Sequence, residues 1–186
     1  MQLLNITQIN DFAFKIADSV KSTAMNNIMQ ILGASFLLVI PVLVLYLAIK
    51  RDKNVFALAV AGALLYIISD TIKLIVREPR PCTVPQLSWI NAPSCESSFS
   101  FPSNHASVLT GLVFFTNKYK YLKIAYIVWL VFVLFGRIYL GLHYFTDVLA
   151  GIALSIIISY AVYVKRDKIY AFGLRLLPFL KRFFGG

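Results

Sequence analysis

Charged side chains are scarce in this sequence of 186 residues. They make up 14% of the chain, and only 8 residues are acidic, whereas 59% of the residues are hydrophobic. An ordinary soluble domain carries about 25% charged residues, and the mean hydropathy here is +0.76. The composition therefore excludes a soluble domain and indicates an integral membrane protein.

Cysteine and histidine are also scarce, with two residues of each. No histidine or carboxylate stands at metal-ligand spacing from Cys82 or Cys95, so this pair does not predict a metal site. The start of the chain lacks the basic residues, clean apolar core and small-residue cleavage site of a signal peptide. Internal repeats and low-complexity tracts do not stand out. The sequence is therefore interpreted from its apolar runs and the polar segments between them.

Long apolar runs divide the chain, and five of them predict membrane-spanning helices, since a crossing needs about 20 residues. They are residues 28–49, 55–76, 104–117, 124–141 and 147–164. The third run is short, and its polar first turn is expected to face protein and water. The pattern predicts an all-α, polytopic membrane helix bundle of five to six helices.

The two ends of the chain differ from the spans. Residues 1–27 mix apolar and charged positions, which is typical of an amphipathic helix at the membrane interface, with a short first span as the alternative. Residues 165–186 are basic and aromatic and predict an amphipathic tail on the cytoplasmic surface. Residues 28–164 between them are the expected membrane catalytic domain.

Lysine and arginine crowd three connections, residues 50–53, 118–123 and 165–168. Five alternating spans place these connections on one side of the membrane, which the positive-inside rule makes cytoplasmic. The polar joins described next then lie on the extracytoplasmic side. Anionic lipid headgroups explain the net charge of +10, so no nucleic acid partner is expected.

The segment from Pro102 to Ser107 joins a polar loop to an apolar run. Ser103 is a favourable N-cap, so the first-turn N–H groups of the helix that follows have no partner in the helix and attract anions such as phosphate. His105 in that first turn can exchange a proton with a bound anion. The sequence therefore predicts an anion site beside a titratable group.

Two further joins carry cations and a carboxylate. Lys73 and Arg80 stand where prolines end an apolar run. Arg137 precedes His143 and Asp147, which are four residues apart and would share one face of a helix. An imidazole paired with a carboxylate, a second imidazole and several cations suit phosphoryl transfer.

Together these segments resemble the three signatures of the type 2 phosphatidic acid phosphatase superfamily. The likeness consists of lysine, six residues and Arg-Pro (73–81), Pro-Ser-x-His (102–105), and arginine, five residues, histidine, three residues and aspartate (137–147), in that order. The resemblance implies an integral-membrane lipid phosphatase. Within the family, the sequence looks most like bacterial undecaprenyl diphosphate phosphatases, lipid A 1-phosphatases and phosphatidylglycerophosphate phosphatases.

The resemblance also implies roles for individual residues. His143 would be the nucleophile that forms a phosphohistidine, Asp147 would orient it, and His105 would be the general acid and base. The phosphate oxygens would be bound by Lys73, Arg80, Ser103, Asn104 and Arg137. Side-chain cations would serve in place of a metal, and no cofactor is expected. Asn104 and Gly136 depart from the glycine and serine usual at these positions, which leaves the detailed phosphate contacts open.

Cys82 and Cys95 both lie in the loop assigned to the extracytoplasmic side, where disulfides persist. A bridge would close a loop of about 14 residues and contribute about 3 kcal/mol on the chain-entropy model. Two free thiols are the alternative.

The predicted function is hydrolysis of a terminal phosphate from a lipid phosphate or diphosphate, such as undecaprenyl diphosphate, lipid A 1-phosphate or phosphatidylglycerophosphate. The expected place is the extracytoplasmic face of the cell (inner) membrane, with no obligatory protein partner. Transfer of the phosphate to another lipid acceptor uses the same intermediate and stays open. An anion channel or transporter is a further alternative, which the nearly uniformly apolar centres of the spans disfavour.

Overall fold

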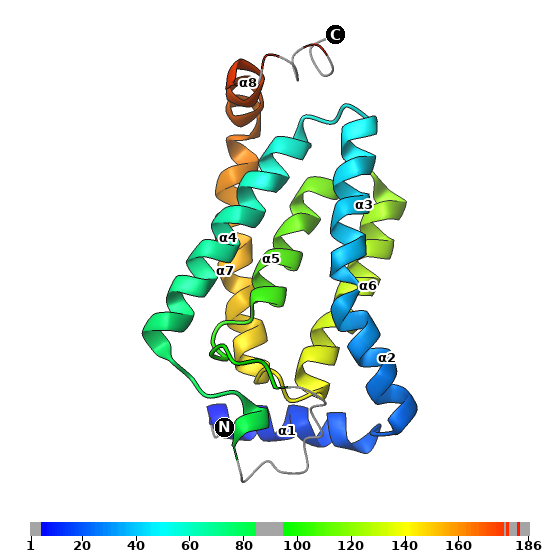
Figure 1. Cartoon of the computed structure of the whole chain (residues 1–186), viewed down its shortest axis with the longest axis vertical. Coiled ribbons are helices and arrows are strands. Elements are labelled where there is room, and N and C mark those ends of the chain that lie inside the picture. The colour runs from blue at the N-terminus through cyan, green and yellow to red at the C-terminus, as the bar shows by residue number, and fades with distance from the viewer. Residues whose placement is uncertain (1–4, 85–94, 177, 179–181, 183–186) are drawn as a thin grey trace.

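The computed structural model describes residues 5–84, 95–176, 178 and 182, and no strand occurs among them. Figure 1 shows an elongated bundle of helices. The helices are α1 (Ile6–Ser19), α2 (Thr23–Ala34), α3 (Phe36–Ile49), α4 (Asn54–Val76), α5 (Asn104–Leu112), α6 (Lys120–Tyr139), α7 (Phe145–Val164) and α8 (Arg166–Leu176), with the short 3₁₀ helices η1 (Pro81–Thr83) and η3 (Val113–Thr116). The all-α class is confirmed.

Four stretches of the described chain are long and apolar enough to cross a membrane. They are Thr23–Ile49, Asn54–Thr83, Lys120–Tyr139 and Phe145–Val164. The predicted polytopic membrane bundle is thereby confirmed. The third expected span, residues 104–117, differs, because α5 has only 9 residues before η3. At about 1.5 Å per residue it covers about 14 Å, less than the roughly 30 Å of the hydrocarbon core.

Helix α5 lies inside the bundle instead, packed chiefly against α7 and α4 (Figure 1). Gly151 of α7 makes this close approach possible. A Cβ atom at this position would lie 2.8 Å from the Cβ of Ala106 and 2.8 Å from the carbonyl oxygen of Ser103. Glycine therefore sets how near the start of α5 comes to the start of α7.

The first span consists of two helices that meet at Ser35. The Ser35 hydroxyl donates to the carbonyl oxygen of Leu32 (2.6 Å) and accepts from Trp129 Nε1 of α6 (2.8 Å). A side-chain hydrogen bond to the preceding turn competes with the regular helix ladder. The break between α2 and α3 is thus tied to α6.

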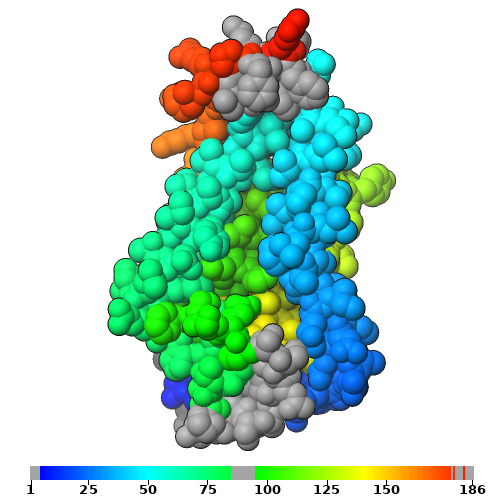
Figure 2. Space-filling model, viewed as in Figure 1, coloured from blue at the N-terminus to red at the C-terminus, as the bar shows by residue number. Residues whose placement is uncertain are grey.

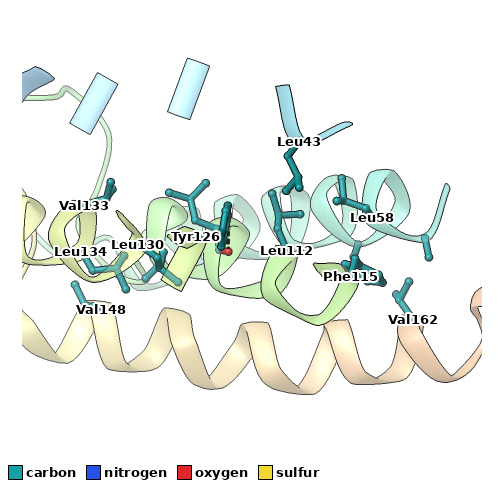
Figure 3. Packing of buried hydrophobic residues seen from close by; sticks show 14 of the residues in the cluster. Leu43, Leu58, Leu112, Phe115, Tyr126, Leu130, Val133, Leu134, Val148 and Val162 are labelled. Atoms are coloured by element: carbon teal, nitrogen blue, oxygen red, sulfur yellow. Dashed lines mark hydrogen bonds between the residues drawn. The ribbon is translucent and has the colours of Figure 1, made fainter. Parts of the chain in front are cut away.

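Apolar side chains fill the middle of the bundle (Figure 3). Residues with almost no exposed surface in this cluster are Leu47, Leu109, Leu112, Phe115 and Val133. The hydroxyl of Tyr126 enters this region and donates to the carbonyl oxygen of Leu109 (2.9 Å). Large apolar side chains are also exposed on the outer faces, as a lipid-facing surface requires: Leu37, Leu38, Val42, Leu45 and Ile157.

The three basic connections meet at one end of the bundle. Lys53 forms an ion pair with Asp167, and the Lys118 Nζ lies 3.9 Å from a carboxylate oxygen of Asp52. The joins between α3 and α4, α5 and α6, and α7 and α8 are therefore neighbours. Hydropathy counting placed these joins on one side of the membrane, and the fold brings them together.

The opposite end holds α1 and the three predicted signature segments (Figure 1). Figure 2 shows the loop before α5, in green, on the surface at this end, and part of the α6–α7 region, in yellow, between that loop and α2. Helix α1 lies across the end of the bundle. Asn10 Nδ2 donates to Thr146 Oγ1 (3.2 Å), and the Thr146 N–H donates to Asn10 Oδ1 (3.2 Å).

The division of the chain into residues 1–27, 28–164 and 165–186 stays a prediction. Helix α1 buries Phe14 and Ala17 against the bundle and exposes Phe12. Helix α8 extends from Arg166 to Leu176. Most of the predicted amphipathic tail after Leu176 lies outside the described residues.

Candidate active site

Four helix ends meet at the α1 end of the bundle: the end of α4, the start of α5, the end of α6 and the start of α7. Beside them is a cavity of about 220 Å³, lined by residues of α3, α4 and α5, by the loops before α5 and by the turn between α6 and α7. Its polar lining consists of Lys73, Arg80, Glu96, Ser98, Asn104, His105 and His143, and its apolar lining of Phe36, Ile40, Tyr66, Val108 and Leu109. A polar pocket thus continues into an apolar wall formed by α3, α4 and α5.

A tight turn positions His143. Helix α6 ends at Tyr139, and Gly141 follows with a positive φ of 64°, which glycine adopts without strain. The N–H groups of Leu142 and His143 both donate to the carbonyl oxygen of Arg137 (3.0 and 3.2 Å). This turn reverses the chain before α7 and directs the imidazole into the cavity.

The contacts of His143 determine which ring nitrogen carries the proton. Arg80 Nη1 lies 3.2 Å from His143 Nε2. A guanidinium group can only donate, so Nε2 is the acceptor and the proton sits on Nδ1. Nδ1 faces the carboxylate of Asp147, with 3.5 Å between Nδ1 and Oδ2. The unprotonated Nε2 therefore points toward the cavity cations.

Asp147 is fully buried behind the imidazole. Its Oδ2 accepts from the Ser100 hydroxyl (2.5 Å) and from the Tyr144 N–H at the start of α7 (2.9 Å). Its backbone carbonyl oxygen accepts from the Ser103 N–H (3.1 Å). The carboxylate is thus held rigidly, and the same residue links α7 to the start of α5.

Burial of His143, together with the positive charges of Arg80, Arg137 and Lys73, lowers the pKa of the imidazole to about 4, although Asp147 acts in the opposite direction. The imidazole is therefore neutral at pH 7. A neutral imidazole has the free electron pair that a nucleophile needs.

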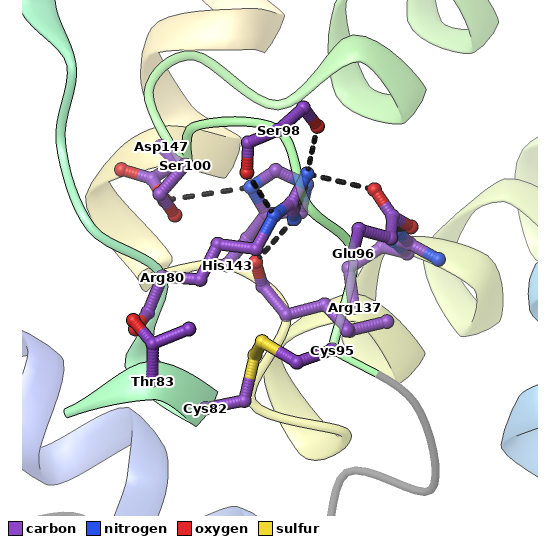
Figure 4. The surroundings of a disulfide bond; sticks show 11 residues. Arg80, Cys82, Thr83, Cys95, Glu96, Ser98, Ser100, Arg137, His143 and Asp147 are labelled. Carbon is purple, nitrogen blue, oxygen red and sulfur yellow. Dashed lines mark hydrogen bonds and ion pairs between the residues drawn. A yellow bond between two sulfur atoms is a disulfide. The ribbon is translucent and has the colours of Figure 1, made fainter. Parts of the chain in front are cut away.

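Arg80 and Arg137 share one carboxylate, that of Glu96 (Figure 4). Arg80 Nη2 donates to Glu96 Oε2 (2.7 Å), and Arg137 Nη2 donates to Glu96 Oε1. Burial by itself raises the pKa of Glu96, but the charges of Arg137 and Arg80 outweigh it and lower the pKa to about 2. The bridging carboxylate is ionised.

Arg80 is further held by the loop before α5. Its Nε donates to the Ser98 carbonyl oxygen (2.7 Å), its Nη2 donates to the Ser98 hydroxyl (2.8 Å), and its Nη1 donates to the Leu142 carbonyl oxygen (2.6 Å). Lys73 Nζ holds the same loop by donating to the carbonyl oxygens of Phe99 (2.8 Å) and Ser100 (3.0 Å). Both cations are buried.

The first residues of α5 line the cavity, whereas its N-cap residue does not. Ser103 is the N-cap, its hydroxyl accepts from the Ala106 N–H (3.4 Å), and it is not among the residues that line the cavity. Asn104 lines the cavity and accepts from the Ser69 hydroxyl (2.6 Å). His105 lines it too. Of the predicted site residues, Lys73, Arg80, Asn104, His105 and His143 face one cavity, and Asp147 and Ser103 lie behind it.

His105 packs edge-on against Phe36 of α3, with 4.9 Å between ring centroids. Its Nε2 is buried and has no hydrogen-bond partner among the residues that the structure describes. Arg137, His105 and Glu96 also line a neighbouring pocket beside α2 and α3. Arg137 thus reaches the same region from the end of α6.

Cys82 and Cys95 form a disulfide with 6.0 Å between their Cα atoms (Figure 4). The Cys82 N–H donates to the Gly141 carbonyl oxygen (2.9 Å). The bridge therefore attaches the residue before Glu96 to the turn that carries His143.

Sequence reasoning missed Glu96, Ser98 and Ser100 as site residues. A signal for Glu96 was present, because it is the only acidic residue between the expected phosphate-binding Arg80 and Ser103. The serines carried no such signal, since Ser97 and Ser98 are adjacent and equivalent in the sequence.

Comparison with known families identifies the group to which this arrangement belongs. The model of the PAP2 superfamily matches residues 54–170, which hold all three signature segments and every residue described in the cavity except those of α3. The chain belongs to the PAP2 superfamily. The PAP2 resemblance expected from the sequence is thereby confirmed.

Three relatives of the chain carry names of lipid phosphatases. The chain is 29% identical over 124 residues to an undecaprenyl-diphosphatase of Sulfolobus acidocaldarius, covering 65% of this chain and 60% of that protein. It is 39% identical over 89 residues to phosphatidylglycerophosphatase B of Bacillus subtilis, covering 41% and 44%. A lipid A 4'-phosphatase of Porphyromonas gingivalis is 32% identical over 68 residues, covering 35% and 29%. The matches thus span three fifths or less of each relative.

Two solved structures resemble the fold over most of its length. One is a transmembrane PAP2 type phosphatidylglycerolphosphate phosphatase from Bacillus subtilis, with a TM-score of 0.67 and 25% identity over 88% of this chain and 87% of that one. The other is Aquifex aeolicus LpxE, with a TM-score of 0.69 and 21% identity over 80% and 91%, which shows the fold alone. The PAP2 assignment and the membrane bundle therefore agree.

Proposed function

We propose that this PAP2 protein is a membrane lipid phosphatase that removes the terminal phosphate of a lipid phosphate or diphosphate. One observation carries the proposal. His143 presents an unprotonated Nε2 beside the Arg80 guanidinium, with Asp147 behind Nδ1, in a cavity that continues into an apolar wall. A phosphate headgroup suits the polar part, and an acyl or prenyl chain suits the apolar part.

In the first step, Nε2 of His143 attacks phosphorus, the Nε2–P bond forms, and the bond from phosphorus to the lipid oxygen breaks. His105 enters this step as the imidazolium, gives its proton to the departing oxygen and becomes neutral. The His143 imidazole becomes positively charged while its Nδ1 keeps its proton, and the Asp147 carboxylate stabilises this charge. The products of the step are the dephosphorylated lipid and a phosphohistidine.

In the second step, His105 takes a proton from water, and the resulting hydroxide attacks phosphorus in line with the Nε2–P bond. That bond breaks, inorganic phosphate forms, and His143 returns to its neutral state. We propose that Lys73 and Arg80, which line the cavity, and Arg137, which lines the neighbouring pocket, stabilise the charge on the equatorial oxygens in both steps. Because three side-chain cations supply this stabilisation, we propose catalysis without a metal.

The substrate class follows from the relatives and the cavity. The relatives are named as hydrolases of three lipids: a polyprenyl diphosphate, a glycerophospholipid phosphate and a lipid A phosphate. All three substrates combine a terminal phosphate with a long apolar part. We propose that the substrate is one of these and that undecaprenyl diphosphate is the first to test.

We also propose that the cavity opens to the extracytoplasmic side of the cell membrane. The basic connections and the cavity lie at opposite ends of the bundle, and the positive-inside rule assigns the basic end to the cytoplasm. In intact cells, an impermeant thiol reagent should then label Cys82 or Cys95 after mild reduction. Labelling that needs cell lysis would reverse the orientation.

The function is tested by phosphate release from purified protein in detergent on undecaprenyl diphosphate, lipid A, phosphatidylglycerophosphate and phosphatidate. We expect one substrate to dominate, chelator to leave the rate unchanged, and His143→Ala to abolish release while the protein stays folded. A rate that is lost with chelator and restored by magnesium would refute metal independence. Phosphate that appears on an added acceptor lipid instead of in solution would identify a phosphotransferase.

A further inference from the structure

The Glu96 carboxylate occupies the position between two arginines that the proposed reaction assigns to phosphate. Each carboxylate oxygen accepts from a different guanidinium group, Oε2 from Arg80 and Oε1 from Arg137. Both arginines are buried, with 2% and 5% of their surface exposed, whereas the Glu96 side chain is 43% exposed. The cations are therefore fixed, and the anion between them has room to leave.

The same arginine also engages the proposed nucleophile. Arg80 donates to Glu96 through Nη2 and contacts His143 Nε2 through Nη1. Arg137 Nε is buried and has no hydrogen-bond partner within the described part of the chain. An anion with three oxygens could use this donor, but the two oxygens of Glu96 leave it unpaired. The site is thus a better match for a phosphate than for the carboxylate that fills it.

We propose that Glu96 is a positioning residue that acts as an internal competitor of phosphate, holding Arg80 and Arg137 in place when the site is empty and being displaced by the substrate's phosphate. This inference rests on the proposed lipid phosphatase function. It predicts that Glu96 weakens the binding of both substrate and product, because each must replace it on the arginines.

The chemistry explains why such a competitor is useful. Two buried guanidinium groups without a counter-anion are costly, and an ionised carboxylate between them reduces this cost. A phosphate held by three cations also leaves slowly, and a tethered carboxylate that returns to the arginines favours its departure. Glu96 directly follows Cys95, which is bonded to Cys82. The bridge keeps the carboxylate near its place and so raises its effective concentration at the arginines.

The first test compares binding of inorganic phosphate to wild type, Glu96→Gln and Asp11→Asn by isothermal titration calorimetry in detergent. Asp11→Asn is the matched control, because it also removes one negative charge at this end of the molecule, on the exposed surface of α1. Since the Glu96 pairs are partly exposed and screened, we expect the phosphate dissociation constant to fall about tenfold in Glu96→Gln. It should stay within about twofold in Asp11→Asn.

Kinetics provide a second readout on the dominant lipid substrate. Glu96→Gln should lower KM and the inhibition constant of phosphate together, because the same competitor opposes both. An unchanged or weaker phosphate affinity in Glu96→Gln would overturn the proposal, since a merely structural carboxylate loosens the arginines when it is removed.

The binding test does not depend on turnover. If wild type releases no phosphate from any lipid but Glu96→Gln still binds phosphate more tightly, the function fails and the role of Glu96 stands. If wild type is active and the affinities do not differ, the role of Glu96 fails alone.

A structure of the wild type with orthovanadate tests the inference without a variant and applies even if Glu96→Gln does not fold. We expect vanadate oxygens on Arg80 and Arg137 and the Glu96 carboxylate moved away from both. Vanadate bound at His143 with Glu96 still on both arginines would overturn the inference.

Discussion

Replacing Asp147 with asparagine removes one negative charge behind His143 and changes little else. Oδ2 of Asp147 accepts from Ser100 and from the Tyr144 N–H, and an amide oxygen can accept both bonds. Charge-assisted hydrogen bonds are roughly twice as strong as neutral ones. The free energy of unfolding should therefore fall by only about 1–2 kcal/mol.

The effect on the rate should be larger. In the proposed reaction, the His143 imidazole gains a positive charge when Nε2 forms its bond to phosphorus, and the Asp147 carboxylate lies 3.5 Å from Nδ1. Two unit charges about 4 Å apart attract each other by about 4 kcal/mol at an effective dielectric constant of about 20. Since each 1.36 kcal/mol is a factor of ten, kcat should fall about 10³-fold. KM should change little, because the charge develops only as the bond forms.

The assay is phosphate release at saturating and limiting substrate, with circular dichroism and thermal unfolding as checks of the fold. Ser100→Ala is the matched control, because it removes one hydrogen bond to the same oxygen and keeps the charge. It should lower kcat only about tenfold, as expected for one charge-assisted bond. A folded Asp147→Asn protein with kcat within about threefold of wild type would refute the role of the carboxylate, as would a loss confined to KM.

Three further predictions concern the pH dependence of the rate below pH 7, the contact between α5 and α7, and the disulfide. Burial lowers the pKa of His143 to about 4, so the proposed nucleophile stays neutral above that pH. Protonation of His143 should therefore not lower kcat/KM, corrected for substrate ionisation, between pH 7 and 5. A fall of kcat/KM to half its value near pH 6.5 would contradict this. Gly151→Ala should lower the free energy of unfolding by about 1–3 kcal/mol, measured by thermal unfolding, and should also slow phosphate release, because the new Cβ would meet Ala106 and Ser103. Gly62→Ala is the control and should be close to neutral, because its Cβ would have no atom within 4 Å. Replacing Cys82 and Cys95 together with serine should lower stability by about 3 kcal/mol, and a reductant should lower the melting temperature of wild type but not of this variant.

Much of the fold could be predicted from the length and position of apolar runs. The predicted span over residues 55–76 corresponds to α4 (Asn54–Val76), and the one over 147–164 to α7 (Phe145–Val164). A run of this length has few structures open to it in lipid, because every backbone polar group must be paired within the segment. Residues 104–117 were less predictable, since nothing local distinguishes a short buried helix from a short span.

The break between α2 and α3 at Ser35 is a second feature that the local sequence could not predict. Residues 28–49 read as one continuous apolar span, yet the chain forms α2 and α3 with Ser35 between them. The hydrogen bond from Trp129 of α6 to the Ser35 hydroxyl comes from a residue 94 positions away. Hydropathy along one segment carries no information about such a partner.

The sequence by itself determined the membrane character, the helical class and the types of side chain available for phosphoryl chemistry, because these depend on composition and on spacing within single segments. It also separated the basic connections from the signature segments. Only the tertiary structure decided which proton position His143 adopts, that Asn104 lines the cavity whereas Ser103 does not, and that Glu96 bridges Arg80 and Arg137. These features join residues from different helices and loops, and contacts of that kind arise only when the bundle packs.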